Sequence, residues 1–208
     1  MRSRETRLYD VVRQRIEEVK EPYRYGLMFQ YLAGARVSEV CGRWAFTRDD
    51  YEVADFEGEP VLVCILKTAK RRGRERAIAL PLNPEYEPWS RDLLRYFEEC
   101  RGVPFDWSRW TQWNYARRAF DGLTYQIEDY VHPRVKRLIG RHERDLRTHG
   151  LRHIRATELI NVYRFNPVQL ATFMGWKLSS ALGGSRTMDR YVSLQWHDYF
   201  PKLLKRRR

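Results

Sequence analysis

The sequence predicts an α+β fold that is mainly helical and contains one small three-stranded antiparallel sheet. Apolar residues recur at helical spacing over most of the chain. Residues 51–82 differ, because they alternate between apolar and polar side chains and then form short apolar runs, as strands do. No linker, internal repeat or low-complexity segment interrupts the 208 residues, so residues 1–208 are expected to form a single domain.

The first elements are expected to be helices. Residues 6–20 carry apolar side chains at helical spacing, and Pro22 opens a second helix over residues 23–32. A short third helix is expected to begin at Arg36. One turn of that helix would place Arg36 and Glu39 near the same face.

The segment 51–82 is expected to form the sheet. Residues 51–56 alternate, residues 61–66 read as a buried strand, and residues 77–80 read as the partner of that strand. A long basic hairpin tip is expected between the last two strands. It contains Lys67, Lys70, Arg71, Arg72 and Arg74.

The remainder of the chain again shows helical patterns. The expected helices are 89–100, 109–120, 127–140, 151–163, 167–174 and 187–196. Asn166 is expected to cap the helix that starts at Pro167, because Asn is a favoured cap and Pro suits the first turn. Residues 201–208 are expected to be a basic tail.

Composition indicates a globular protein with a polyanionic partner. The net charge is +12 with a pI near 9.8, and 43% of the residues are hydrophobic. Only seven of the 39 basic residues are Lys, and the planar fork of Arg suits phosphate oxygens, although a GC-rich genome would produce the same bias. The three Cys residues show no metal-ligand spacing, and no apolar run suggests a signal peptide or membrane span. A cytoplasmic protein without a membrane association is therefore expected.

The residue types needed to attack a DNA phosphate without a metal recur along the chain. Arg36 and Arg152 can each grip a phosphate through two donors, and together with His149 they can hold a pentacovalent phosphate. Trp176 offers an indole N–H donor, and Tyr191 offers a nucleophilic phenol.

These residues lie in segments that resemble the catalytic domain of the tyrosine recombinases, also called phage-type integrases. The segments are 34–39, 149–157 and 170–176, followed by Tyr191, and the likeness extends over about residues 15–200. The motif at 149–157 is the most specific, whereas the motif at 34–39 would be weak alone. The resemblance is much stronger for all of these motifs together, because they occur in the family's order around an expected sheet.

The resemblance implies roles for the site residues. Tyr191 would attack the scissile phosphate and become a 3′-phosphotyrosine, while Arg36 and Arg152 stabilise the added negative charge. His149 would donate to a phosphate oxygen or accept the tyrosine proton. Trp176 would bind a phosphate oxygen without moving a proton.

Two further residues complete the implied site. Lys67 would protonate the 5′-oxygen leaving group, with Lys70 as the competing candidate, and Glu39 would hold the geometry of the site. The intermediate conserves the bond energy, so the resemblance implies no metal, no ATP and no other cofactor. Candidate DNA contacts are Lys70, Arg71, Arg72, Arg74, Arg117 and Arg118.

The resemblance also implies partners, and the chain departs from the family at two points. Double-stranded DNA is the expected partner, with weak self-association in isolation and a tetramer on DNA. The family usually carries a core-binding domain before the catalytic one, and this chain is expected to lack it, either because it was excised or because it is naturally missing. Fifteen positions separate Trp176 from Tyr191, more than is usual, so delivery of Tyr191 in cis or to a neighbouring protomer stays open.

Other interpretations of the same residues remain. A type IB topoisomerase-like enzyme would share the chemistry but relax supercoils. A regulator on the same scaffold would bind DNA without cleaving it, and a basic helical protein could bind RNA. Tyr163 and Tyr199 rival Tyr191 as the nucleophile, and His153 is expected to pack or to hydrogen-bond beneath the site.

Overall fold

A computed structural model describes residues 7–42, 46–68, 74–130, 138–176 and 195–205. It confirms the α+β class and the predicted three-stranded antiparallel sheet. The helices of the described residues are α1 (Leu8–Glu17), α2 (Tyr23–Leu32), α3 (Val37–Val40), α4 (Pro88–Glu99), α5 (Arg109–Ala119), α6 (Thr148–Asn161), α7 (Pro167–Met174) and α10 (Phe200–Leu203), with short 3-10 turns η1 (Arg48–Asp50) and η3 (Trp196–Asp198).

The three-stranded sheet has the order β1 (Tyr51–Phe56), β2 (Glu59–Thr68), β3 (Arg74–Pro81). A two-residue turn at Glu57 and Gly58 joins the first two strands. Both residues have positive φ, 54° and 88°, as a hairpin turn matched to the strand twist requires. Strands β2 and β3 are longer than predicted and include residues that the sequence had placed in the hairpin tip.

A second sheet replaces the helix predicted over residues 127–140, and that prediction is wrong. The chain forms an antiparallel pair, β4 (Thr124–Tyr130) and β5 (Leu138–Asp145). Residues 124–128 alternate, which favours a strand, and Pro133 would have broken a helix through this segment. The hairpin packs on α6 through Tyr125. The ring of Tyr125 comes so close to Gly150 of α6 that a Cβ added there would lie only 2.8 Å from it.

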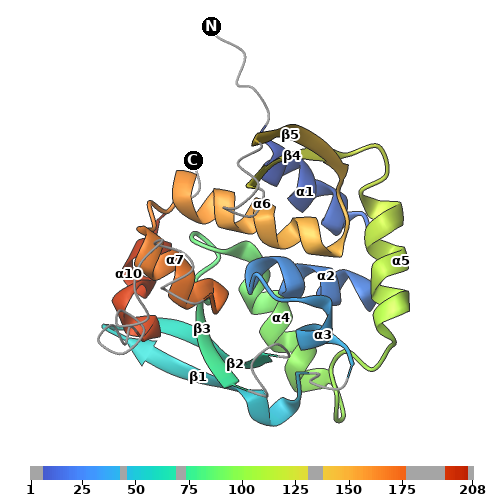
Figure 1. Ribbon diagram of the computed structural model, residues 1–208. Helices are drawn as coiled ribbons and strands as arrows, with labels where there is room; N and C mark the ends of the chain where they lie inside the picture. The colour runs from blue at the N-terminus through green and yellow to red at the C-terminus, as the bar shows by residue number, and fades with distance from the viewer. Residues whose placement is uncertain (1–6, 43–45, 69–73, 131–137, 177–194, 206–208) are drawn as a thin grey trace, which may run out of the picture.

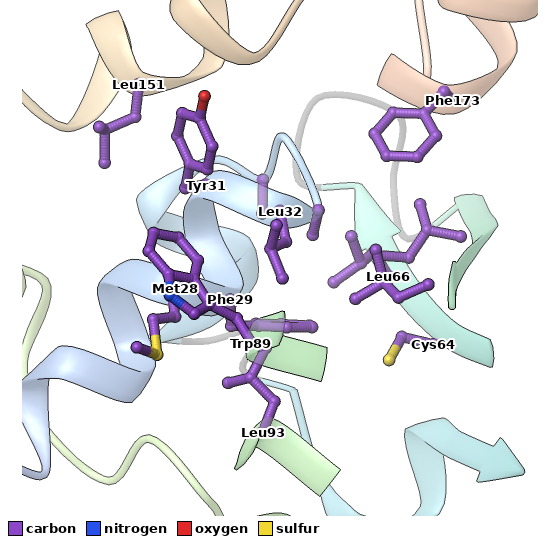
Figure 2. Packing of buried hydrophobic residues seen from close by; sticks show 14 of the residues in the cluster. Met28, Phe29, Tyr31, Leu32, Cys64, Leu66, Trp89, Leu93, Leu151 and Phe173 are labelled. Atoms are coloured by element: carbon purple, nitrogen blue, oxygen red, sulfur yellow. The ribbon is translucent and has the colours of Figure 1, made fainter. Parts of the chain in front are cut away.

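Helix α2 lies at the centre of the core and is buried along nearly its whole length (Figures 1 and 2). It contacts α1, α4, α5 and α6. In Figure 2 its side chains Phe29 and Leu32 point toward Trp89 and Leu93 of α4 and Leu66 of β2. A helix that is buried on nearly every side forms only when other elements enclose it and when its buried polar side chain, Gln30, is hydrogen-bonded.

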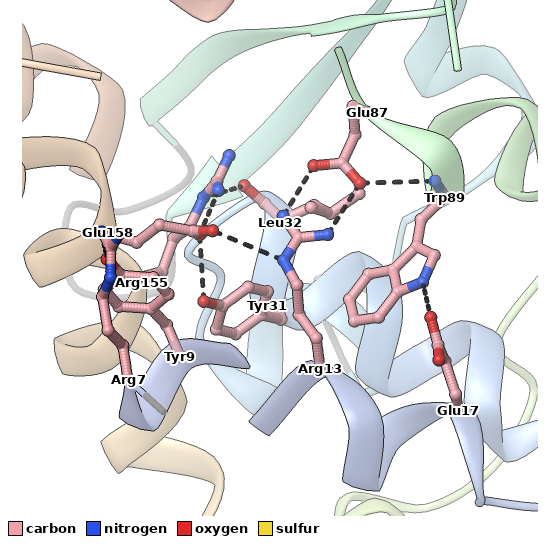
Figure 3. Close-up of polar contacts among 10 residues, drawn as sticks. All are labelled: Arg7, Tyr9, Arg13, Glu17, Tyr31, Leu32, Glu87, Trp89, Arg155 and Glu158. Carbon is pink, nitrogen blue, oxygen red and sulfur yellow. Dashed lines mark hydrogen bonds and ion pairs between the residues drawn. The ribbon is translucent and has the colours of Figure 1, made fainter. Parts of the chain in front are cut away.

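A buried ionic network joins α1, α4 and α6 across the top of this core (Figure 3). Arg13 donates to both oxygens of Glu87, at 2.8 and 2.6 Å, and its Nε lies 3.4 Å from Glu158 Oε1. The other Glu158 oxygen accepts from Tyr31, at 3.0 Å, and from Arg155, at 2.5 Å. Because buried charges must be paired, this network fixes α6 against α1 and α2.

The C-terminal segment folds back onto its own chain. Tyr199, Phe200 and Leu203 are buried, and the Tyr199 ring packs against Phe165 and Phe173. The basic tail therefore begins later than the predicted boundary at 201. None of the helices in the described parts of the chain is both long and apolar enough to cross a membrane.

Candidate functional site

The first site residues meet at the turn between α2 and α3. Arg36 occupies the N-cap position of α3, and its backbone N–H and its Nη1 both donate to Glu39, at 3.0 and 2.6 Å. The Glu39 side chain is fully buried, whereas the Arg36 side chain is 23% exposed. Glu39 therefore holds the backbone and guanidinium of Arg36 in one orientation.

Arg76 is a member of this cluster that sequence reasoning missed. Its Nη2 lies 3.5 Å from Glu39 Oε2 and donates to the carbonyl of Ala33 at 3.0 Å, while its Nη1 donates to the carbonyl of Phe173. Burial lowers the pKa of Arg76, and Glu39 offsets part of that effect. The sequence offered one indication of this position. Arg76 and the buried Ile78 are two positions apart on the same strand, so their side chains point to the same face of the sheet.

Arg152 lies on the buried face of α6 and reaches the same turn. Its terminal nitrogens donate to the carbonyls of Gly34 and Met174, and its guanidinium lies 5.7 Å from the centroid of the Trp176 ring. Burial, followed by the nearby cations Arg76 and Arg36, lowers its pKa to about 9. Arg152 thus remains charged at neutral pH. The buried carboxylate of Glu39 pairs directly with Arg36 and Arg76, and its charge also raises the pKa of Arg152.

His149 lies in the first turn of α6 and is exposed. Its ring lies 5.1 Å from the ring of His153, which in turn lies 5.8 Å from Tyr125. His153 is exposed as well, so it is not packed beneath the site, and a hydrogen bond there stays a prediction. Partial desolvation and then the charges of His149 and Arg152 lower the pKa of His153.

A pocket of about 200 Å³ joins these groups. Its lining residues are Ala35, Arg36, Val37, Ser38, Arg109, Thr148, His149 and Arg152. The pocket therefore collects three arginines and a histidine from α3, α5 and α6, and none of the lining residues within the described ranges is a carboxylate. Arg109 was not singled out from the sequence, because one Arg at the start of a helix carries no distinguishing pattern.

Two buried amide side chains, Gln30 and Gln112, hold the walls of this pocket together. Gln30 of α2 donates to the carbonyl of Thr148 at 3.1 Å and accepts from Gln112 of α5 at 3.1 Å. Gln112 also accepts from the indole N–H of Trp107 at 2.9 Å. Because each amide is buried and paired, this chain fixes the start of α6 relative to α5, and with it His149 relative to Arg109.

Trp176 follows the end of α7. Gly175 turns the chain with φ of 63°, and the Trp176 backbone N–H donates to the carbonyl of Ala171 at 2.8 Å. The indole is half-buried beside Arg152 and does not line the pocket.

Lys67 takes a different position from the one predicted. It belongs to β2, where it pairs with Glu75, and is not part of the hairpin tip. Its Nζ lies 2.8 Å from Asp50 Oδ1, and hydrogen bonding to this carboxylate raises the pKa of Lys67. Burial alone would raise the pKa of Asp50, but hydrogen bonds from Lys67 and Thr47 hold it below its usual value. Lys67 is therefore engaged by Asp50 and does not line the pocket.

The remaining predicted residues fall into two groups. Tyr191, Lys70, Arg71 and Arg72 lie outside the described residues, as does the side chain of Arg74. Arg117 and Arg118 are exposed at the end of α5.

The two rival nucleophiles are buried in the structure. Tyr163 is 1% exposed and Tyr199 is 0% exposed, and the Tyr199 hydroxyl donates to the carbonyl of Ala77 at 3.2 Å. Burial raises the pKa of both phenols. Neither hydroxyl is placed to meet a DNA strand.

The structure was also searched for metal ligands, and the chain was compared with known proteins. Among the described residues, no group of three or more His, Cys, Asp or Glu side chains could hold a metal ion. Comparison of the chain with known protein families, with curated proteins and with solved structures finds no match.

Proposed function

We propose that the protein cleaves and religates DNA through a 3′-phosphotyrosine at Tyr191, as a site-specific recombinase. One observation carries this proposal. Arg36, His149 and Arg152, which the sequence selects from segments more than 100 positions apart, line a single pocket. Arg109 adds a further cation there. A pocket with these donors, and with no carboxylate among its described lining residues, suits a phosphodiester.

In the proposed reaction, the Tyr191 oxygen attacks the scissile phosphorus, and the bond from phosphorus to the 5′-oxygen breaks. The tyrosine proton leaves through His149 or water, and the 5′-oxygen takes up a proton from Lys67. Arg36 and Arg152 stabilise the charge that develops on the phosphoryl oxygens. Attack of a 5′-hydroxyl on the phosphotyrosine reverses the step and rejoins the strand.

The proposal requires two rearrangements when DNA binds. Lys67 has to leave Asp50 to reach a leaving group, and at least part of the Arg152 guanidinium has to turn from the carbonyls of Gly34 and Met174 toward the phosphate. Buried hydrogen bonds to carbonyls are replaced by stronger hydrogen bonds to a charged oxygen, which makes the second change favourable.

A nicked suicide duplex tests the chemistry. Wild type should form a covalent protein–DNA band on a denaturing gel, with no metal present, and Tyr191→Phe should form none. Tyr199→Phe serves as the matched control, because its hydroxyl is buried, and it should keep the band. A band that persists in Tyr191→Phe would contradict the assignment of the nucleophile.

Further assays, combined with the covalent band, separate the competing functions. Relaxation of supercoiled plasmid without strand exchange between two sites would indicate a type IB topoisomerase-like activity. DNA binding without a covalent band on any substrate would indicate a non-catalytic regulator, since the phosphate pocket would then serve binding alone.

A further inference from the structure

The outward face of α5 carries a stacked column of side chains. Trp110 and Trp113 stack with their ring centroids 4.9 Å apart and an interplanar angle of 14°. The guanidinium of Arg117 lies 5.7 Å from the centroid of the Trp113 ring. These three residues recur at steps of three and four, so they share one face of the helix. We call them the α5 column.

The column does not contribute to the core. The opposite side of α5 is held by the buried residues Gln112 and Ala116 and by Tyr115, which stacks on Tyr23 at 3.9 Å. Trp110 is 66% exposed, the largest value among the exposed large hydrophobic residues in the described parts of the chain. Since one of its faces stacks on Trp113, the exposed area belongs mainly to the other face, where a further planar group can stack.

The column adjoins the phosphate pocket. Arg109, the residue before Trp110, lines that pocket with Arg36 and His149. The stem of Arg109 packs against Gly42, where an added Cβ would lie 3.3 Å from Arg109 Cδ. The first turn of α5 therefore presents a cation to the pocket and an open indole face beside it. Figure 1 shows α5 along one side of the molecule, next to α3.

Charge determines which partner fits the column. Arg109, Arg117 and Arg118 are exposed on α5, and the helix contains no acidic residue. The exposed indole face of Trp110 can stack a planar, uncharged ring, and the neighbouring Arg side chains can bind a phosphate backbone that is attached to that ring. Nucleobases have this chemistry, and stacking on aromatic side chains tolerates any base.

We propose that the α5 column stacks an unpaired nucleobase of the DNA strand whose backbone occupies the adjacent pocket. This inference rests on the proposed function, because strand cleavage and exchange produce unpaired bases next to the reacting phosphate. A paired base keeps its neighbours in the duplex stack and cannot cover Trp110. The column therefore distinguishes single strands and frayed or gapped duplexes from intact duplexes.

Fluorescence anisotropy with labelled DNA tests the inference, using a single strand, the fully paired duplex, and the same duplex with a short gap. Trp110→Ala should weaken binding of the single strand and the gapped duplex by about tenfold, and should change binding of the intact duplex little. Trp110→Phe should keep most of the affinity, because a ring remains. The matched control is Val53→Ala, which shortens an exposed apolar side chain of β1, far from α5 in Figure 1.

The outcomes separate the two proposals. If Trp110→Ala binds the single strand as tightly as wild type does and still forms the covalent band, the stacking role of the α5 column is wrong. The proposed function would be unaffected. Equal losses on all three substrates would also overturn the stacking role, because a general DNA contact does not select unpaired bases. Failure of wild type to bind any DNA would overturn both proposals.

Discussion

Arg76 reaches from β3 to the fully buried carboxylate of Glu39, with 3.5 Å between Arg76 Nη2 and Glu39 Oε2. The same carboxylate binds Arg36, and its charge also favours the protonated form of Arg152. Glu39 is thus the shared counter-charge of three guanidinium groups that come from three separate elements.

Removal of this counter-charge should destabilise the whole protein. Glu39→Gln leaves buried cations without their carboxylate, so the free energy of unfolding should fall by about 3 kcal/mol. Urea denaturation at neutral pH measures the change. Glu52→Gln, which neutralises an exposed carboxylate of β1, is the control and should change little. An equal effect of the two substitutions would show that Glu39 does not have this role.

The Lys67–Asp50 pair should make stability depend on pH. The pKa of Asp50 is lowered in the folded protein, so its contribution is present above the unfolded value of about 4 and is lost as the pH falls through the folded value. The pKa of Lys67 is raised, so its contribution is present below about 10.4 and is lost as the pH rises through the folded value.

Asp50→Asn should therefore lower the free energy of unfolding by about 1 kcal/mol at pH 7, because Lys67 is partly exposed and solvent weakens the pair. The difference between variant and wild type should shrink as the pH is taken below 4. Urea titrations at several pH values measure it. A difference that stayed constant across this range would indicate a packing effect in place of an ionic one.

Gly150 should be intolerant of a side chain. An added Cβ would lie 2.6 Å from Leu146 Cδ1 and 2.8 Å from the Tyr125 ring, so α6 and the β4–β5 hairpin would have to separate. Gly150→Ala should cost about 1–3 kcal/mol, although Ala is the better helix former. Thr157→Ala on the exposed face of α6 is the control and should cost less than 1 kcal/mol. Thermal denaturation followed by circular dichroism compares them.

Arg109 should contribute to DNA affinity through its charge. If a phosphate occupies the pocket, Arg109→Gln should weaken binding of every DNA sequence to a similar degree and reduce the slope of log K against log salt concentration by about 1. Arg91→Gln removes an exposed cation of α4 and should leave both quantities nearly unchanged. A normal salt slope in Arg109→Gln would exclude this residue as a phosphate contact.

Local sequence patterns predicted the elements that depend on local interactions. Residues 23–32 form α2 with the predicted bounds, and Asn166 caps α7 through reciprocal hydrogen bonds with Gln169, at 2.8 and 3.1 Å. The three strands also appear in the predicted order. The prediction for 127–140 failed, because the apolar residues Ile127, Tyr130, Val131 and Leu138 recur at helical spacing although Pro133 interrupts the segment.

The sequence by itself determined the helical character of most of the chain, the three-stranded sheet, and the positions of Arg36, His149 and Arg152 as candidate partners. Only the tertiary structure brought these three residues to one pocket and placed Arg76 against Glu39. It also paired Lys67 with Asp50 and left one face of Trp110 exposed next to Arg109. The physical reason is that capping and periodicity act between neighbours along the chain. Ion pairing, burial and ring stacking depend on which distant segments the core brings together.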